Sequence, residues 1–382
     1  MKLSRLVLVV AVVVGWGCTQ IPVVGVVGPS TGTDAAYGLA VDRGVDLALE
    51  DASGRLPDDF QMVRVDSRSS PERAAEEVRR LVRDQGVRVI LGGMTSAEAD
   101  ALLPVIEDEQ VVCLSPSASG SDLGRRSRYF YRLAPTDEEE GRAAARHLVN
   151  ERGVATVVVY TDGSRLTRDV EAEFRQYFEM KLGGKIVATV HLSEEGWRDR
   201  SADTLNAFNP EAVYIVGHAA RILESLDDLK FNGFKGVRCT TSTFYLADVL
   251  ADAGPIADNV IFPLPVYDVA SSREPSHTFV EQFEGRYGRR PDIFSAQGFD
   301  AMRVAIRTLV GAESLHSEDV RKALSYGLRD FLGVTGPIAF NEAGDVTRYP
   351  VMHCIRSGCV RPCSTLREET KAKIRTFIRG MG

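Results

Sequence analysis

Short apolar runs alternate with amphipathic patterns along most of this chain. The runs Val23–Val27, Gln61–Val65 and Val87–Leu91 have the length and composition of buried strands. Between them, apolar residues recur at helical spacing from Val41 to Ala52, and Pro71 stands where the next helix would begin. Strands that alternate with helices of about ten to fifteen residues indicate right-handed crossovers and a parallel sheet.

A second series of the same kind follows Pro135. Its expected elements are strands at 155–160, 185–191, 212–216, 237–241 and 259–263, and helices near 167–181, 202–208 and 221–231. Helical patterns at 277–287 and 296–310 then return to the first unit. The chain is also too long for one ordinary core. We therefore predict an α/β fold of two doubly wound parallel-sheet lobes that are joined by three hinge crossings.

The predicted boundaries follow from this path. Residues 18–135 and 265–336 form the first lobe, and residues 136–264 and 337–363 form the second. Residues 1–17 are a predicted signal peptide. The tail 364–382 is basic and amphipathic, and we expect a docked or frayed terminal helix rather than a membrane binder.

Two hydroxyl-rich turns stand at the centre of the predicted first lobe. Thr95 and Ser96 follow the run Val87–Leu91, and Ser117 and Ser119 follow the run Gln110–Leu114. Each turn precedes a predicted helix, so the turns meet at the carboxyl edge of the sheet. Helix-start amides and hydroxyls at such an edge can hold a small anion such as a carboxylate. Any one of these residues alone is more simply a helix cap, and only the cluster indicates a binding site.

Composition and charge narrow the possible partners. The 382 residues are 44% hydrophobic and 26% charged, which is typical of a folded protein. The formal net charge of −7 becomes −9 if the segment that contains Lys2 and Arg5 is removed, and no basic stripe is present. We therefore expect no nucleic-acid partner.

The N-terminus resembles an export signal. Lys2 and Arg5 precede a nine-residue apolar core at 6–14, which is too short to span a bilayer stably. Small residues around Trp16 and directly before Cys18 resemble a bacterial lipobox, in which the cysteine is lipidated. A plain signal peptide is the alternative, and either reading predicts an exported protein, periplasmic or on the cell surface.

The remaining cysteines are odd in number. Cys113 and Cys239 lie in strand-like runs and are expected to be buried as small apolar side chains. In an oxidising compartment, the trio Cys354, Cys359 and Cys363 is expected to supply one disulfide and leave one thiol. A metal site at this trio is the less favoured alternative, because no histidine follows at suitable spacing.

Catalytic motifs are not evident. The sequence contains no P-loop, no dinucleotide-binding glycine pattern and no nucleophile elbow, and its histidines are scattered. The acidic run Asp137–Glu140 follows Thr136 as a capping box, so we interpret it as a helix start rather than a metal site. We expect no cofactor, no metal and no enzyme, but reversible capture of a small polar molecule.

Several motifs in order resemble the type I periplasmic solute-binding proteins, in particular the leucine/isoleucine/valine-binding components of ABC importers. The resemblance runs from about residue 21 to residue 358. It rests on Val24–Gly32 with Ala36-Tyr37-Gly38, Gly92–Ser96, Leu114–Ser119, Ala134–Asp137 with Gly141–Ala144, Tyr287–Pro291, Phe299–Ala301 and Thr335–Phe340. The family implies a two-lobed clamp that closes on its ligand by a hinge motion.

The resemblance also implies the ligand contacts of the first lobe. The ligand carboxylate would be held by Ser96 or Thr95, by the backbone at Ser117 and by the hydroxyl and amide of Ser119, with Ala118 between them. Tyr37 would line the pocket from the same lobe.

The second lobe departs from the family pattern. Leu166 and His218 stand where amino-acid binders place aromatic residues, and Ser242 falls in the turn after Cys239, where an acid would pair with the ligand ammonium. Since a buried ammonium without a carboxylate is costly, either another acid such as Asp162 substitutes or the ligand is not a simple α-amino acid. His218 could instead pair with a second ligand anion.

The resemblance implies a solute-binding protein, and the N-terminal pattern adds a lipid anchor at Cys18. The protein would capture an amino acid or small organic acid and deliver it to an ABC permease in the membrane. A ligand-sensing receptor domain of the same fold that signals to a partner protein is the alternative.

Overall fold

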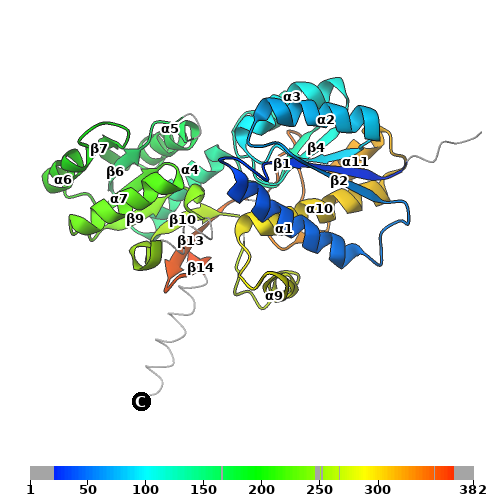
Figure 1. Ribbon diagram of the computed structural model, residues 1–382. Coiled ribbons are helices and arrows are strands. Elements are labelled where there is room, and N and C mark those ends of the chain that lie inside the picture. Colours follow the sequence, from blue (N-terminus) through cyan, green and yellow to red (C-terminus); the bar gives the residue numbers. More distant parts are fainter. Residues whose placement is uncertain are drawn as a thin grey trace, which may run out of the picture.

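The computed structural model describes residues 21–164, 167–245, 250, 253–265, 267–347 and 349–364. Cys18, the predicted signal peptide and almost all of the predicted tail helix lie outside this part of the chain. Within it, the strands and helices form two lobes that lie side by side (Figure 1). The predicted two-lobed α/β fold is confirmed.

The first lobe is built on a parallel sheet with the strand order β2-β1-β3-β4-β5. Its strands are β1 (Val23–Gly28), β2 (Gln61–Asp66), β3 (Val89–Leu91), β4 (Val112–Ser115) and β5 (Phe130–Arg132). Its helices are α1 (Ala35–Ala52), α2 (Pro71–Gln85), α3 (Ser96–Asp108), the short 3₁₀ helix η1 (Leu123–Arg126), α9 (Ser276–Tyr287), α10 (Ile293–Gly311) and α11 (Ser317–Tyr326). Helices α1 and α10 pack against each other although they are far apart in the sequence.

The second lobe has a larger, mixed sheet with the order β14-β13-β10-β9-β8-β6-β7. Its strands are β6 (Thr156–Thr161), β7 (Lys185–His191), β8 (Ala212–Val216), β9 (Val237–Thr240), β10 (Ile261–Leu264), β13 (Val351–Arg356) and β14 (Cys359–Pro362). Its helices are α4 (Asp137–Arg146) with its π-helical continuation η2 (His147–Glu151), α5 (Arg168–Gln176) with η3 (Tyr177–Lys181), α6 (Trp197–Phe208), α7 (Ala219–Phe231), η4 (Ser242–Phe244) and η5 (Gly254–Ala257). The parallel part runs from β10 to β7, and β13 and β14 extend it in the antiparallel sense.

Side-chain caps begin the helices that face the gap between the lobes. The Thr95 hydroxyl accepts a hydrogen bond from the Glu98 amide at the start of α3. The Thr136 hydroxyl accepts one from the Glu139 amide at the start of α4, which confirms the predicted helix start. These caps direct the amino ends of both helices toward the gap, because each helix follows a strand that ends there.

The return of the chain to the second lobe comes later than the expected boundary at residue 337. A two-stranded ribbon of β11 (Phe331–Gly333) and β12 (Gly336–Ile338) precedes a turn that packs on β5. There, the buried guanidinium of Arg132 binds Asp345 at 2.6 Å, and the Arg132 amide donates to the Gly344 carbonyl. This buried ion pair holds the turn on the first lobe, so the chain reaches the second lobe only at β13.

Apolar residues fill the cores of both lobes.

The cysteines lie where the sequence predicts in two cases: the predicted burial of Cys113 and Cys239 is confirmed. Cys354 and Cys363 lie against each other at the edge of the second lobe, and the hydrogen bond between their thiols lowers the pKa of Cys354. Among the described helices, none has the length and apolar content that crossing a bilayer requires.

Candidate functional site

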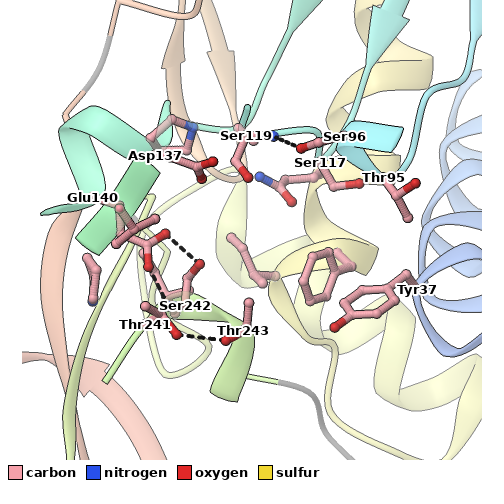
Figure 2. Close-up of a pocket in the computed structure, with 18 of the residues that line it drawn as sticks. Tyr37, Thr95, Ser96, Ser117, Ser119, Asp137, Glu140, Thr241, Ser242 and Thr243 are labelled. Carbon is pink, nitrogen blue, oxygen red and sulfur yellow. Dashed lines mark hydrogen bonds between the residues drawn. The ribbon is translucent and has the colours of Figure 1, made fainter. Parts of the chain in front are cut away.

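A cleft of about 290 Å³ opens between the two lobes and is lined by residues from both. The first lobe contributes the turns after β3 and β4 and the ends of α1 and α10, and the second contributes α4 and the turns after β8 and β9. Figure 2 shows these two groups of side chains facing each other. The volume suits a small molecule rather than a macromolecule.

The two predicted hydroxyl-rich turns meet at this cleft and bind each other. The Ser96 hydroxyl accepts hydrogen bonds from the amides of Ser119 at 3.3 Å and Gly120 at 3.0 Å. The Ser117 hydroxyl donates to the Met94 carbonyl at 2.6 Å. The first-turn amides of α3, at Ser96 and Ala97, have no partner within the helix and lie at the cleft. This wall therefore combines hydroxyls with the positive end of a helix dipole.

The expected first-lobe residues are not all placed alike. Tyr37, Thr95, Ser96, Ser117 and Ser119 line the cleft.

Ala118 does not line it; it is buried behind the turn, where its amide donates to the Ser115 hydroxyl at 3.0 Å. The Ser119 amide, expected to donate to the ligand, donates to Ser96 instead. The structure thus places the turn as predicted but shows a different partner for this amide.

Tyr37 belongs to an apolar wall. Its ring meets Phe294 edge to face, with centroids 5.1 Å apart, because α1 and α10 pack closely. Burial raises the pKa of the Tyr37 hydroxyl, so this hydroxyl stays neutral and can donate a hydrogen bond. Ile293 and Leu264 continue the apolar surface along the cleft.

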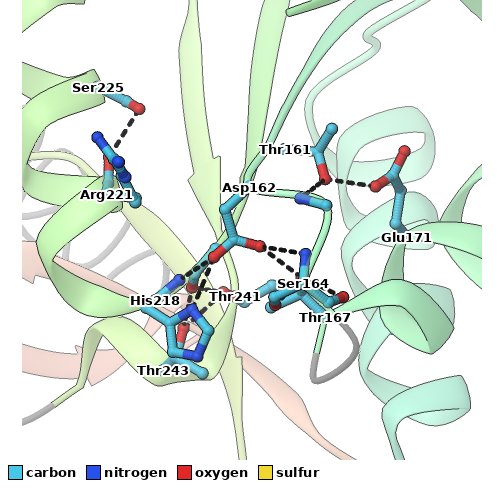
Figure 3. A network of polar contacts seen from close by, with 12 residues as sticks. Thr161, Asp162, Ser164, Thr167, Glu171, His218, Arg221, Ser225, Thr241 and Thr243 are labelled. Atoms are coloured by element: carbon cyan, nitrogen blue, oxygen red, sulfur yellow. Dashed lines mark hydrogen bonds and ion pairs between the residues drawn. The ribbon is translucent and has the colours of Figure 1, made fainter. Parts of the chain in front are cut away.

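In the second lobe, His218 lines the cleft but is bound to Asp162. The Asp162 carboxylate accepts hydrogen bonds from the His218 amide at 2.9 Å and from its Nδ1 at 2.7 Å (Figure 3). Burial alone would raise the pKa of Asp162, but the bonds from His218, Ser164 and Thr167 outweigh it and lower the pKa. The bond to Asp162 in turn raises the pKa of His218.

The structure does not place Asp162, the substitute acid that we considered, in the lining of the cleft. Both of its carboxylate oxygens accept bonds from its own lobe. Leu166, also predicted to line the pocket, lies outside the described residues.

Two acids that the sequence interpretation treated only as a helix start also line the cleft. Asp137 and Glu140 on α4 are 6% and 8% exposed. The Glu140 carboxylate accepts hydrogen bonds from the Ser242 amide and hydroxyl, each at 2.7 Å, so Ser242 is occupied by this acid (Figure 2).

Burial raises the pKa of both acids. It raises the pKa of Asp137 to about 6 and that of Glu140 to about 7, and the negative charge of Asp137 adds to the shift of Glu140. A sequence signal for them existed. The spacing of Asp137 and Glu140 places them on the same helix face as Ala144 and Leu148, which are buried.

Within the described ranges, no group of three histidine, cysteine, aspartate or glutamate side chains is arranged to hold a metal ion.

Comparisons with known proteins agree with the fold. The model of the periplasmic binding protein family matches residues 23–356. The leucine-, isoleucine-, valine-, threonine- and alanine-binding protein of Pseudomonas aeruginosa is 23% identical over 333 residues, which cover 85% of this chain and 87% of that protein.

Solved structures share the architecture. A leucine-binding protein of Thermotoga maritima superposes with a TM-score of 0.79 at 24% identity, covering 90% of this chain and 97% of the other. A solute-binding protein of an ABC transporter from R. palustris, solved with benzoate, has a TM-score of 0.77 at 21% identity, with 90% and 95% covered. The family match spans both lobes and the cleft between them, and the chain belongs to the periplasmic binding protein family.

Proposed function

We propose that this protein is an exported, lipid-anchored solute-binding protein that captures a small carboxylate-bearing molecule between its lobes. It closes by a hinge motion and delivers the ligand to an ABC permease. The observation that carries this proposal is the cleft itself, because its first-lobe wall presents hydroxyls and helix-start amides to a volume of about 290 Å³. Relatives that are named for amino-acid binding support the ligand class.

Export and anchoring rest on the N-terminal pattern. The apolar segment before Cys18 supports a signal peptide, and the small residues next to Cys18 support lipidation. Family membership supports an extracytoplasmic location. Metabolic labelling with a radioactive fatty acid tests the anchor: Cys18→Ala should abolish incorporation, and unchanged incorporation would contradict lipidation at Cys18.

A thermal-shift screen over amino acids and small organic acids tests the ligand class. A ligand at a hundred times its dissociation constant adds roughly 2.7 kcal/mol to the free energy of unfolding, which raises the melting temperature measurably. The Ser119→Ala variant should weaken binding of each stabilising ligand at least tenfold, because it removes a hydroxyl at the carboxylate end.

The matched control is Ser272→Ala, since Ser272 is exposed and outside the cleft. If Ser119→Ala bound every stabilising ligand as tightly as the unmodified protein, the proposed carboxylate site would be wrong.

A further inference from the structure

The second-lobe wall of the cleft contains two buried acids, Asp137 and Glu140, and no lysine or arginine is among the described residues that line the cleft. Asp137 and Glu140 lie three residues apart on α4, so their carboxyl groups share one face of the helix. Acidic side chains are seldom buried to this extent unless they are paired or coordinate a cation. Here both of them line a cavity, which is the place where a missing partner would enter.

The nearest cation is already used. Burial raises the pKa of Asp137, and a hydrogen bond from the Ser119 side chain and the charge of the Arg132 guanidinium partly offset this rise. However, Arg132 forms its ion pair with Asp345 and also donates to the Gly120 carbonyl at 2.5 Å. Asp137 therefore shares the Arg132 cation with Asp345. Since Arg132 and Asp345 together are neutral, the charge of Asp137 is not fully balanced.

Glu140 has no cationic partner at all among the described residues. Both of its hydrogen bonds come from Ser242, which is neutral. No lysine or arginine is among the residues that line the cleft, and His218 directs its Nδ1 to Asp162. Each carboxylate oxygen has two acceptor positions, and Ser242 occupies one on each oxygen, so Glu140 keeps capacity for further donors.

The two walls of the cleft differ in the groups that they offer a ligand. The first-lobe wall offers the Ser96 hydroxyl, which accepts from two amides and keeps its own proton to donate, and the amino end of α3; Asp34 is its acid. The second-lobe wall offers the Glu140 and Asp137 carboxyl groups, and Tyr37 lies across the cleft from Glu140, on the side of Thr95 (Figure 2). Tyr37 and Phe294, whose rings are in contact, supply apolar surface there. A ligand with one negative end, one positive end and a small apolar group fits this arrangement.

Building on the proposed function, we infer that the ligand is an amino acid or a similar amine-bearing carboxylate, and that Glu140 is the residue that binds its ammonium group. Ser242, in the turn where the sequence lacks an acid, positions Glu140 through its amide and hydroxyl. An acid from α4 thereby lies against the turn after β9. A carboxylate without an amine leaves Glu140 unpaired, and a second anion in the cleft is repelled by it.

Other titratable groups face Glu140 from the elements around it. They are Asp137 on the same helix, Tyr214 on β8 and Cys239 on β9. Asp137 adds negative charge, and Tyr214 and Cys239 remain neutral because burial raises their pKa values. Since none of these supplies a positive charge, an incoming ammonium favours the ionised form of Glu140. Binding near pH 6 to 7 is then accompanied by release of a proton, because burial holds the pKa of the unliganded group near 7.

Titration calorimetry with matched ligands tests the inference. The probes are the common amino acids, the deaminated analogues 4-methylpentanoate and 3-methylbutanoate, and benzoate. Binding is measured at pH 6 in two buffers of different ionisation enthalpy, which reveals proton release. We expect an amino acid to bind at least tenfold more tightly than its deaminated analogue and to release a proton.

The Glu140→Gln variant should weaken amino-acid binding at least tenfold and abolish the proton release. Its affinity for deaminated acids should stay the same or rise, since glutamine keeps both contacts to Ser242 without the charge. Glu138→Gln is the matched control, because Glu138 on the same helix pairs with Arg142 and does not line the cleft.

The outcomes separate the two proposals. If benzoate or a deaminated acid binds at least as tightly as every amino acid, or if Glu140→Gln leaves amino-acid affinity unchanged, the inference is wrong while carboxylate capture stands. If no carboxylate of either class binds, carboxylate capture itself is contradicted, and the inference fails with it.

Discussion

Replacement of Glu140 by glutamine should change how the stability of the unliganded protein depends on pH. A carboxyl group whose pKa is higher in the folded than in the unfolded protein stabilises the fold while it is protonated. This contribution is complete below the unfolded pKa and is lost as the pH rises through the folded pKa. Burial raises the pKa of Glu140 from 4.5 to about 7, so the loss falls between about pH 4 and pH 7.

The size of the effect follows from the same shift. One pKa unit corresponds to about 1.4 kcal/mol, so ionised Glu140 destabilises the unliganded fold by about 3 kcal/mol relative to its protonated form. Part of this is already present at pH 5, because the unfolded chain is ionised there. The stability advantage of Glu140→Gln over the unmodified protein should therefore grow by about 2 to 3 kcal/mol as the pH rises from 5 to 8.

Urea unfolding followed by far-ultraviolet circular dichroism at pH 5 and pH 8 measures this difference. The unmodified protein serves as the reference, so that titrating groups that do not interact with Glu140 cancel. Glu138→Gln should show no such gain, because Glu138 is partly exposed and pairs with Arg142. A stability difference between Glu140→Gln and the unmodified protein that is the same at both pH values would refute the reasoning.

The remaining predictions concern the edges of the two lobes. Asp345→Asn should lower the free energy of unfolding by about 3 to 5 kcal/mol in urea titration, because it leaves the charge of fully buried Arg132 without its ion-pair partner. A loss below about 1 kcal/mol would show that the pair is not needed to hold the turn. Incubation with oxidised glutathione should join Cys354 to Cys363, whose thiols are already in contact, with two glutathione molecules released and Cys359 left free for alkylation. Peptide mapping that found Cys359 in the disulfide would contradict this pairing.

Much of the fold could be predicted from local patterns. The buried strand β8 and the partly exposed strand β7 have the predicted bounds, because each is a continuous apolar or alternating run between polar turns. Helix α11 was not predicted, since only Val320 and Leu324 are buried in it and its sequence is otherwise polar. Strand β5 was missed because three residues are too few for a periodic signal.

The candidate site could be predicted on one side only. Ser96 and Ser119 follow strands that are neighbours in the sheet, so their proximity follows from strand order and helix starts. Glu140 and Ser242 are 102 residues apart, and nothing in the local pattern links an acid in a helix start to a serine after β9.

By itself, the sequence determined the alternation of strands and helices, the division into two lobes and the hydroxyl-rich turns of the first lobe, because each depends on spacing over a few residues. Only the tertiary structure decided which acids face the cleft. It assigned Asp162 to His218 and buried Glu140 against Ser242. The physical reason is that the charge state and the partners of an acid depend on burial and on packing between distant segments.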